Sequence, residues 1–343
     1  MKIIIRNFAF FLATLLMCLS QGCKKPGWIS LESGTQYLLN GVWFSDINTG
    51  FIVGGRDRGI IMHTTDGGET WKDQKSTSGP MYFGVCFCDS MHGWVVGHNG
   101  AILHTTDGGN TWTQQTSGTT LQLYSVFCLD ANKVWIVGAL GTILQTTNGG
   151  AIWSRQASGI SPSVWDIFFT SSDTGFAVAG WCVGCWGSPF YGSYILHTTN
   201  GGITWDIQKL DTTIIGLYGI FFTSASKGYV VGASGTILST ANGGITWIKQ
   251  LSGTTNDLWD VFFTDSNNGI VVGGNAVIDI PLGGTILRTT NGGTTWNKQK
   301  IPTDIVLRRV YFTDANQGTA VGFYGTILRT TTGGEPLAKN RQD

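Results

Sequence analysis

The chain has 343 residues, of which 50 are Gly, 14 Trp and 18 Phe, and its 21 Lys and Arg residues balance its 21 Asp and Glu residues. Zero net charge removes the basic surface that recruits nucleic acid, so we expect no nucleic-acid partner. Abundant Gly and aromatic residues, without an amphipathic helical pattern, indicate many short strands and tight turns rather than helices.

The chain begins with two basic residues, Lys2 and Arg6, followed by an apolar run of 12 residues. Such a run is too short to cross a bilayer as a helix and is typical of a secretion signal. Residues 1–22 resemble a bacterial lipoprotein signal, which implies that Cys23 becomes the acylated first residue and that residues 23–27 form a tether. The protein would then be lipid-anchored to a membrane of the bacterial cell envelope. An ordinary cleaved signal with an incidental cysteine is the alternative.

A nine-residue segment, HTTDGGETW at residues 63–71, recurs along the chain. The later copies read HTTDGGNTW, QTTNGGAIW, HTTNGGITW, STANGGITW, RTTNGGTTW and, in a degenerate form, RTTTGGEPL. The Trp that ends each copy stands at positions 71, 112, 153, 205, 247 and 296, so the steps are 41, 41, 52, 42 and 49 residues. Periods of about 40 to 45 residues with turn residues at fixed offsets are typical of propeller blades.

Each period predicts the same four strands in the same order. An aromatic-rich inner strand such as VFFT is followed by a strand such as GYVVG, a strand GTILxTT and, after a DGG or NGG turn, a strand TWxxQ. The inner strands contain seven equivalent starting points: Val42, Val85, Val126, Ile167, Ile220, Val261 and Val310. Residues 28–337 are therefore predicted to form an all-β, seven-bladed β-propeller of four-stranded antiparallel blades, followed by a polar tail at 338–343.

The two ends of the repeat are predicted to complete one another. The last copy lacks its Trp and its outer strand, while residues 28–35, WISLESGT, resemble TWTQQTSGT at 111–119. The amino-terminal segment then supplies the outer strand of blade seven, and Trp28 becomes the seventh member of the Trp series. Closure of this kind covers the sheet edge that an incomplete blade would expose.

The repeated turn is interpreted as a structural staple rather than a metal or catalytic site. Its acceptor position changes from Asp to a neutral residue in five of seven copies, which a metal-binding carboxylate would not tolerate. A hydrogen-bond acceptor tolerates this change, paired Gly residues permit positive φ, and the Trp fills space beside the neighbouring strands. The turn residues with their Trp partners are Asp66 and Trp71, Asp107 and Trp112, Asn148 and Trp153, Asn200 and Trp205, Asn242 and Trp247, and Asn291 and Trp296, with Thr332 in the last copy.

These (S/T)xDxGxTW turns, which follow GTIL strands, resemble the turns of the Asp-box, or BNR, propellers. Together with GWVVG strands they most resemble the photosystem II assembly and stability factor family, across residues 28–337. Members of that family form seven-bladed propellers. The resemblance implies a non-enzymatic scaffold, without a cofactor, that holds a protein or peptide client. A membrane-embedded protein is one such client.

The residues that precede the inner strands differ from blade to blade. Asp166, Asp260 and Arg309 stand directly before three of these strands and are expected to face one mouth of the channel. One place earlier stand aromatic or basic residues: Tyr124, Trp165, Tyr218, Trp259 and Arg308. Two interpretations stay open, because these side chains can pack between the blades or form a rim that binds a partner.

Two insertions lengthen the connection between second and third strands, at residues 179–193 and 273–284, and both are expected at the same mouth. The first insertion concentrates aromatic residues: Trp181, Trp186, Phe190 and Tyr191. Exposed apolar area of this kind favours a peptide, glycan or protein partner. The alternative is a loop that folds its aromatic side chains against its own neighbours.

Cysteines occur in two settings. Cys182 and Cys185 form a CxxC in the first insertion, without the surrounding pattern of a redox enzyme or a second pair for zinc, so an oxidising envelope predicts a local disulfide. Cys86, Cys88 and Cys128 fall in inner strands, where we interpret them as small buried thiols.

The alternative to a scaffold is an Asp-box glycoside hydrolase or a glycan-binding protein that lacks hydrolase activity. A hydrolase needs two carboxylates roughly 5 to 10 Å apart. Asp166 and Asp260 are the one symmetric pair, and their separation by two blades predicts a distance too large for a retaining mechanism, although an inverting pair stays open. His63, His104 and His197 share one repeat position on separate blades, which predicts no common metal ion.

Overall fold

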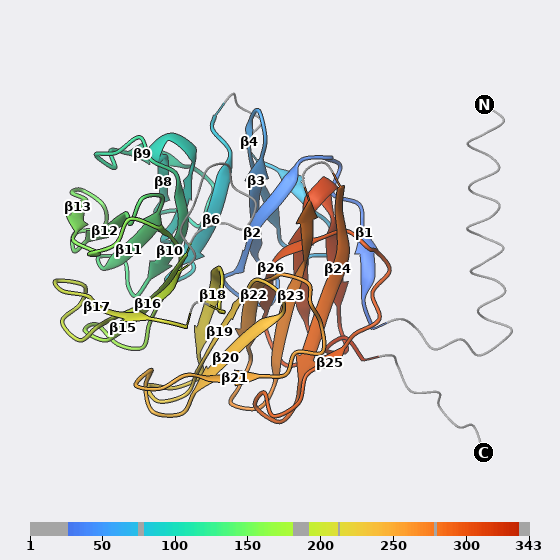
Figure 1. Cartoon of the computed structure of the whole chain (residues 1–343). Coiled ribbons are helices and arrows are strands. Elements are labelled where there is room, and N and C mark those ends of the chain that lie inside the picture. Colours follow the sequence, from blue (N-terminus) through green and yellow to red (C-terminus); the bar gives the residue numbers. More distant parts are fainter. Residues whose placement is uncertain (1–26, 75–78, 181–191, 212, 278–279, 336–343) are drawn as a thin grey trace, which may run out of the picture.

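The computed structural model describes residues 27–74, 79–180, 192–211, 213–277 and 280–335. Within these residues the strands form seven four-stranded sheets in which neighbouring strands run antiparallel (Figure 1). The seven inner strands contact one another in a closed cycle, because the first also contacts the last. The predicted seven-bladed, all-β propeller is therefore confirmed. No helix in the described ranges is long and apolar enough to span a membrane.

The first four blades each run outward from the channel in chain order. Blade one contains β2 (Leu38–Phe44), β3 (Gly50–Gly55), β4 (Gly59–Thr64) and β5 (Lys72–Asp73). Blade two contains β6 (Tyr82–Phe87), β7 (Gly93–Gly97), β8 (Ile102–Thr105) and β9 (Thr113–Gln115), with the single-turn 3₁₀ segment η1 (His98–Gly100) after β7. Blade three contains β10 (Leu123–Cys128), β11 (Val134–Gly138), β12 (Ile143–Thr146) and β13 (Ser154–Gln156). Blade four contains β14 (Ser163–Phe169), β15 (Gly175–Gly180), β16 (Ser193–Thr198) and β17 (Asp206–Lys209).

The last three blades follow the same order until the chain ends. Blade five contains β18 (Leu217–Phe222), β19 (Gly228–Gly232), β20 (Thr236–Thr240) and β21 (Ile248–Gln250). Blade six contains β22 (Leu258–Phe263), β23 (Gly269–Val277), β24 (Ile280–Thr289) and β25 (Asn297–Lys298). Blade seven contains β26 (Leu307–Phe312), β27 (Gly318–Gly322), β28 (Ile327–Thr330) and the amino-terminal β1 (Ile29–Leu31), with η2 (Phe323–Gly325) after β27.

The amino-terminal strand closes the ring as the sequence predicts. Strand β1 pairs antiparallel with β28 through Ile29 opposite Arg329 and Leu31 opposite Ile327. In Figure 1, β1 lies in blue beside the red strands of the end of the chain. Trp28 is fully buried and packs edge-to-face on Phe312, with ring centroids 5.9 Å apart. The last blade is thus completed by the first described residues of the chain.

The repeated turn is held by a short network of hydrogen bonds. In the first copy the Thr64 hydroxyl donates to Asp66 Oδ1 at 2.7 Å, and the Thr70 backbone N–H donates to the same oxygen at 2.9 Å. The Thr70 hydroxyl donates to Asp66 Oδ2 at 2.5 Å. Gly67 and Gly68, with φ of 71° and 82°, make the left-handed turn that a side chain would strain.

A copy with asparagine makes the same turn, but one of its hydrogen bonds runs in the opposite direction. The Thr204 backbone N–H donates to Asn200 Oδ1 at 3.0 Å, as its counterpart does to the aspartate. The Asn200 amide nitrogen then donates to the Thr204 hydroxyl at 2.8 Å, whereas the aspartate accepts from its threonine. An oxygen acceptor is the shared requirement, which explains why the position alternates between Asp and Asn.

The core lies between the blades, where an inner-strand Phe meets the Trp that ends the repeated turn. Phe44 and Trp71, for example, pack edge-to-face with centroids 5.8 Å apart, and five further blades, counted over the described residues, hold an equivalent pair. Blade three departs from this pattern, because Cys128 stands where the others have Phe. Trp153 is packed against the cluster that contains this cysteine.

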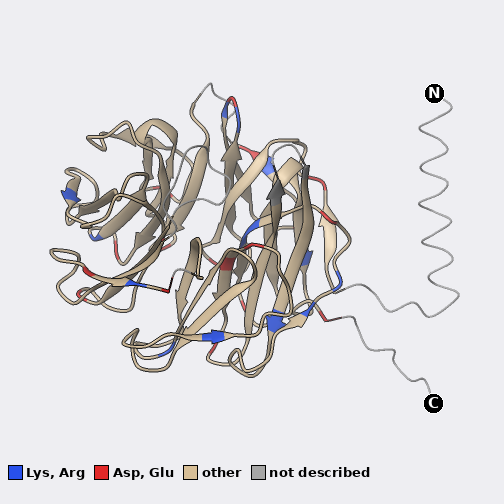
Figure 2. Ribbon diagram, viewed as in Figure 1, with Lys and Arg blue, Asp and Glu red and all other residues tan. Residues whose placement is uncertain are grey.

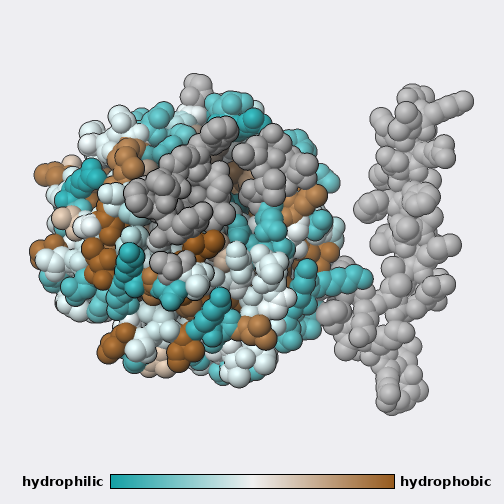
Figure 3. Space-filling model, viewed as in Figure 1, coloured by the Kyte–Doolittle hydropathy of each residue, from teal (hydrophilic) through white to brown (hydrophobic). Residues whose placement is uncertain are grey.

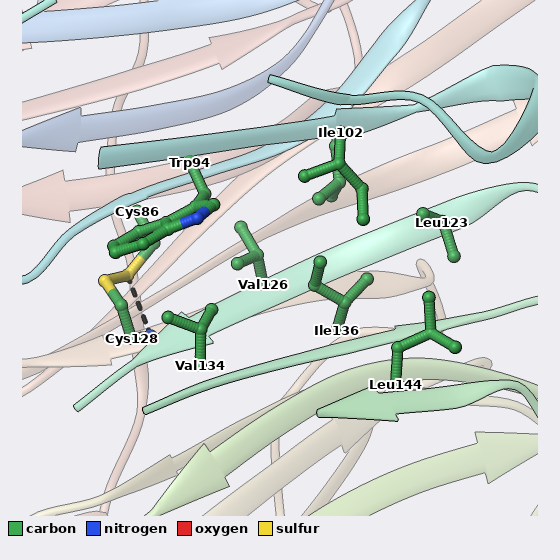
Figure 4. Close-up of a cluster of buried hydrophobic side chains, with 10 residues drawn as sticks. Cys86, Trp94, Ile102, Leu123, Val126, Cys128, Val134, Ile136 and Leu144 are labelled. Carbon is green, nitrogen blue, oxygen red and sulfur yellow. Dashed lines mark hydrogen bonds between the residues drawn. A yellow bond between two sulfur atoms is a disulfide. The ribbon is translucent and has the colours of Figure 1, made fainter. Parts of the chain in front are cut away.

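The interpretation of Cys86 and Cys128 as free thiols is wrong. They form a disulfide that joins the inner strands of blades two and three, with Cα atoms 6.3 Å apart (Figure 4). The Cys128 backbone N–H also donates to Cys86 Sγ at 3.1 Å. The repeat places the two residues 42 positions apart, on adjacent inner strands, which brings them within bonding reach. Cys88 stays a half-buried free thiol, and burial raises its pKa to about 12.

The described surface carries few charges. Segments of the ribbon that carry Lys or Arg are scattered among segments that carry Asp or Glu (Figure 2). Apolar and hydrophilic residues alternate on the face shown in Figure 3. The most exposed large apolar side chains, Ile203, Ile245 and Leu251, belong to outer turns and strand ends rather than to the channel.

Candidate binding mouth and central channel

A β-bulge at the start of every inner strand sets the mouth of the channel. In each blade the register between the first and second strands skips one residue at the same place. A bulge re-aims the side chain that it leaves unpaired. The skipped residues are Asn40, Phe83, Tyr124, Trp165, Tyr218, Trp259 and Arg308, one from each blade. All seven line a small cavity of about 40 Å³ at this mouth.

The aromatic members of this mouth ring contact one another from blade to blade. Tyr124 stacks on Trp165 with centroids 4.6 Å apart, and Tyr218 stacks on Trp259 at 4.3 Å. An edge-to-face contact of 5.9 Å between Trp165 and Tyr218 joins the two stacks. Phe83 extends the row at one end, 5.4 Å from Tyr124. These contacts make one aromatic surface across five blades.

The guanidinium of Arg308 ends the row, 4.0 Å from the centre of the Trp259 ring. Burial, followed by the neighbouring charge of Arg309, lowers the pKa of Arg308 to about 10. A stacked guanidinium of this kind gains cation–π attraction and stays charged at neutral pH. The mouth therefore combines aromatic faces with one positive charge.

The indole N–H groups fix this ring to the bases of the two insertions. Trp165 donates to the carbonyl of Gly180 at 3.0 Å, and Trp259 donates to that of Gly274 at 3.1 Å. Gly180 ends β15, whereas Gly274 lies within β23, at the register shift between Gly273 and Asn275. The two interpretations from the sequence, packing between blades and forming a rim, each hold in part. The aromatic side chains pack across blades, and they also line the mouth.

Three charged side chains meet directly beneath the mouth ring. Arg309 reaches from blade seven to two aspartates, with its Nη1 3.0 Å from Asp260 Oδ1 and 3.4 Å from Asp166 Oδ2. Blade four lies across the ring from blade seven, so this guanidinium spans the channel. The side chains are largely enclosed, with 20% of Arg309 and 9% of each aspartate exposed. We call these three residues the charged plug.

Further hydrogen bonds saturate the plug. Asp166 accepts from the Ser125 hydroxyl at 2.6 Å and from the Ile220 backbone N–H at 3.1 Å. Asp260 accepts from the Val310 backbone N–H at 2.9 Å. These donors come from neighbouring blades, so the carboxylates tie inner strands together.

Burial and neighbouring charges shift the pKa values of Asp260 and Arg309. It raises the pKa of Asp260 to about 6, against the opposing pull of the Arg309 charge. Burial alone would lower the pKa of Arg309, but the two aspartates beside it raise that pKa above its ordinary value. Arg309 is therefore charged throughout the physiological range, while Asp260 takes up a proton in mild acid.

The shared contact with Arg309 limits the distance between the two aspartates. Both contact the same Arg309 nitrogen, at 3.4 and 3.0 Å, so the contacting oxygens are at most 6.4 Å apart. The sequence could not show that one long side chain crosses the channel and draws both toward the axis. Although this spacing suits a hydrolase, the guanidinium occupies the place that a scissile bond would need.

The histidines at the shared repeat position have a packing role. His63, His104 and His197 stack on Phe51, Trp94 and Phe176 of the adjacent strand, with centroids 4.4 to 4.6 Å apart. Burial lowers the pKa of each histidine. No group of three His, Cys, Asp or Glu residues in the described ranges is placed to hold a metal ion.

Several predicted residues lie outside the described ranges. They are the lipidation residue Cys23, the CxxC pair Cys182 and Cys185, and the aromatic residues Trp181, Trp186, Phe190 and Tyr191. Asn40 and Phe83, which complete the mouth ring, were not among the sequence candidates. Alignment of all seven repeats on the residue two places before the inner-strand Val or Ile would have found both.

Comparison with known proteins supports the resemblance seen in the motifs. A family model described as "Photosynthesis system II assembly factor YCF48" matches residues 21–122 and 79–161. This seven-bladed propeller therefore resembles the photosystem II assembly factors. Comparison with curated proteins gave no match.

Solved structures of similar fold include "YCF48 bound to D1 peptide", with a TM-score of 0.71, 23% identity and coverage of 90% of this chain and 98% of that one. "YCF48 from Cyanidioschyzon merolae" has a TM-score of 0.69 and 21% identity, and the match covers 89% of this chain and 98% of that one. The GH74 xyloglucanase from Xanthomonas campestris has a TM-score of 0.64 and 15% identity, and the match covers 92% of this chain but 55% of the enzyme. At these identities the likeness establishes the fold.

Proposed function

We propose that this protein is a non-enzymatic scaffold of the bacterial cell envelope that binds a protein or peptide client at the mouth ring. The observation that carries the proposal is the row from Phe83 through Trp259 to Arg308, in which aromatic faces and a guanidinium share one surface. Trp, Tyr and Arg are the residues that contribute most binding energy in protein interfaces. Their rigid mutual packing reduces the entropy lost when a client binds.

The family resemblance supports a peptide client by analogy. One of the similar propellers was solved as "YCF48 bound to D1 peptide". Binding of a comparable segment here would use the aromatic row for apolar side chains and Arg308 for a carbonyl or carboxylate group. Gly180, at the start of the insertion at residues 179–193, accepts the indole N–H of Trp165 and so lies at this surface.

The charged plug favours binding over hydrolysis. A general acid and a nucleophile or base must reach the substrate, whereas Asp166 and Asp260 are already engaged by Arg309 and by backbone or hydroxyl donors. Replacement of both aspartates by Asn tests the hydrolase alternative. A hydrolytic activity of the purified protein that vanishes in this variant would overturn the scaffold proposal.

The lipid anchor is part of the same proposal. Acylation at Cys23 would leave four residues before Trp28, whose side chain is buried in blade seven. At roughly 3.5 Å per residue this tether reaches about 14 Å, which would hold the propeller close to a membrane and to a membrane-embedded client. Labelling of cells with a radioactive fatty acid should mark the natural chain but not Cys23→Ala, and equal labelling would exclude this anchor.

Affinity purification from the native envelope tests client binding. The variant Trp165→Ala, combined with Arg308→Ala, should lose the co-purifying client because it removes the centre and the charged end of the mouth ring. Ile245→Ala is the matched control, since Ile245 is 75% exposed on an outer turn. Recovery of the same client with the mouth variant would contradict binding at this mouth.

A further inference from the structure

The half of the channel beyond the charged plug contains a second, larger cavity. Its volume is about 330 Å³, and it is lined by inner-strand residues of all seven blades. The mouth cavity and this one share Arg309 as a lining residue, so the guanidinium separates them. The larger cavity is therefore distinct from the proposed client site.

Six aromatic side chains surround this cavity: Trp43, Phe127, Phe168, Phe221, Phe262 and Tyr311. Each stands two residues after the plug level on its strand, and the alternation of a strand points both positions into the channel. Neighbouring rings contact one another at centroid distances from 4.9 to 5.3 Å. All six keep part of their surface accessible.

The seventh position of this aromatic ring is occupied by Cys86. Its sulfur is bonded to Cys128, so the blade-two side of the cavity presents a disulfide in place of a ring. A disulfide is apolar and much smaller than Phe or Trp, and it carries no free thiol that could react with an occupant. The wall therefore stays apolar around its whole circumference.

The polar end of the cavity has no charge to spare for a ligand. Asp166, Asp260 and Arg309 are the charged residues that line it, and they are paired with one another. A charged ligand would lose its hydration without gaining an unpaired counter-ion. A neutral ligand loses little hydration free energy and gains apolar contacts on every side.

We propose that this cavity is a binding site for a small, neutral, aromatic or largely apolar molecule. Its size and lining match those of small-molecule sites, which are mostly apolar and aromatic with a few fixed polar groups. Ring stacking against the six aromatic residues supplies the affinity. The accessible part of Arg309 supplies a donor for one neutral acceptor. The site goes beyond the client-binding proposal and does not depend on it.

A matched pair of fluorescent probes tests the proposal on the mature full-length protein. N-phenyl-1-naphthylamine is neutral, and 8-anilino-1-naphthalenesulfonate is the same skeleton with a sulfonate. The neutral probe should give saturable, one-to-one fluorescence enhancement, with a Kd about tenfold or more below that of the sulfonate. Failure of the neutral probe to bind, or equal binding of both probes, would overturn the proposal.

Two further variants assign the binding to this cavity. Phe221→Trp keeps an aromatic contact in the ring but fills cavity space, and it should weaken binding of the neutral probe about tenfold or more. Phe83→Ala removes a ring from the mouth instead and should leave the affinity unchanged. Near-ultraviolet circular dichroism checks that both variants are folded. Unchanged binding in folded Phe221→Trp, or loss of binding in Phe83→Ala, would place the probe elsewhere and refute the site.

Discussion

The outer turns and the mouth of the channel are built from the same seven repeats, yet they differ in how alike the copies are. At the outer turns the six copies with Asp or Asn share one hydrogen bond, from a backbone N–H to the side-chain oxygen, whether the acceptor is Asp66 or Asn200. At the mouth the seven bulged residues include an amide, five aromatic side chains and a guanidinium. Uniform positions hold the ring together, and the varied positions are where one partner can be distinguished from another.

Loss of the closing Trp should have the largest effect on stability. Trp28→Ala removes a fully buried side chain that packs on Phe312, and we expect it to lower the free energy of unfolding by about 3–5 kcal/mol. Urea denaturation measures the change. Ile29→Ala is the neighbouring control, because Ile29 is 42% exposed and its truncation should cost less than about 0.5 kcal/mol. Equal costs for the two variants would mean that closure does not depend on Trp28.

Removal of Arg309 should lower the free energy of unfolding nearly as much as loss of Trp28. This variant tests whether the charged plug beneath the mouth ring also stabilises the fold. Arg309→Met leaves Asp166 and Asp260 buried without their counter-ion and should cost about 3–5 kcal/mol at pH 8. Arg308→Met, one residue away, breaks no ion pair among the described residues and should cost less. A small effect of Arg309→Met would show that water enters the plug freely.

The disulfide that joins blades two and three should contribute about 2–4 kcal/mol. Cys86→Ser should therefore lower the urea midpoint, and a reducing agent should do the same to the natural protein but not to the variant. Cys88→Ser is the matched control, since Cys88 is a free thiol in the same strand region. Equal stability of Cys86→Ser and Cys88→Ser would contradict the crosslink.

Asp260 should give the stability a distinct pH dependence. Burial raises its folded pKa to about 6 from an ordinary 3.8, so the folded state holds this proton more tightly than the unfolded state. The resulting stabilisation is complete below about pH 4 and is lost as the pH rises through 6. The free energy of unfolding, measured from pH 4 to 8, should therefore decline less steeply in Asp260→Asn than in the natural protein. Parallel profiles would show that Asp260 titrates normally.

A single outer turn should have the smallest effect, because the same bonds are repeated around the ring. Asp66→Asn reproduces the turn of Asn200 and should change stability by less than about 0.5 kcal/mol at pH 7. Asp66→Ala loses the acceptor of Thr64 and Thr70 and should cost about 1 kcal/mol. Thermal unfolding of both variants measures the difference. A large cost for Asp66→Asn would show that the charge, rather than the acceptor oxygen, is required.

The fold could be predicted from the sequence because its signals are local and repeated. The spacing of the Trp residues gave the blade number, and the likeness of residues 28–35 to 111–119 gave the closure, which the pairing of β1 with β28 confirms. Five of the seven mouth-ring residues could also be named from the sequence, but the direction of their side chains could not. That Tyr124, Trp165 and their counterparts are aimed by bulges depends on a register shift that leaves no sequence signature.

The sequence also could not resolve contacts that depend on the reach of single side chains. Arg309 crosses the channel to Asp166, and this distance is set by the ring radius rather than by spacing along the chain. The cysteines were misread for a related reason. Cys86 and Cys128 stand at adjacent rather than identical repeat positions, so their proximity follows from the offset between neighbouring inner strands, which only the structure gives.

Site-specific photo-crosslinking in the native envelope tests most directly whether recognition belongs to the varied mouth. A benzoylphenylalanine at position 124, in the mouth ring, and one at position 245, on an outer turn, place the same reactive group on the two contrasting surfaces. We predict a discrete crosslinked client from position 124 and none from position 245. A client captured from position 245 alone, or equally from both positions, would contradict the assignment of recognition to the mouth.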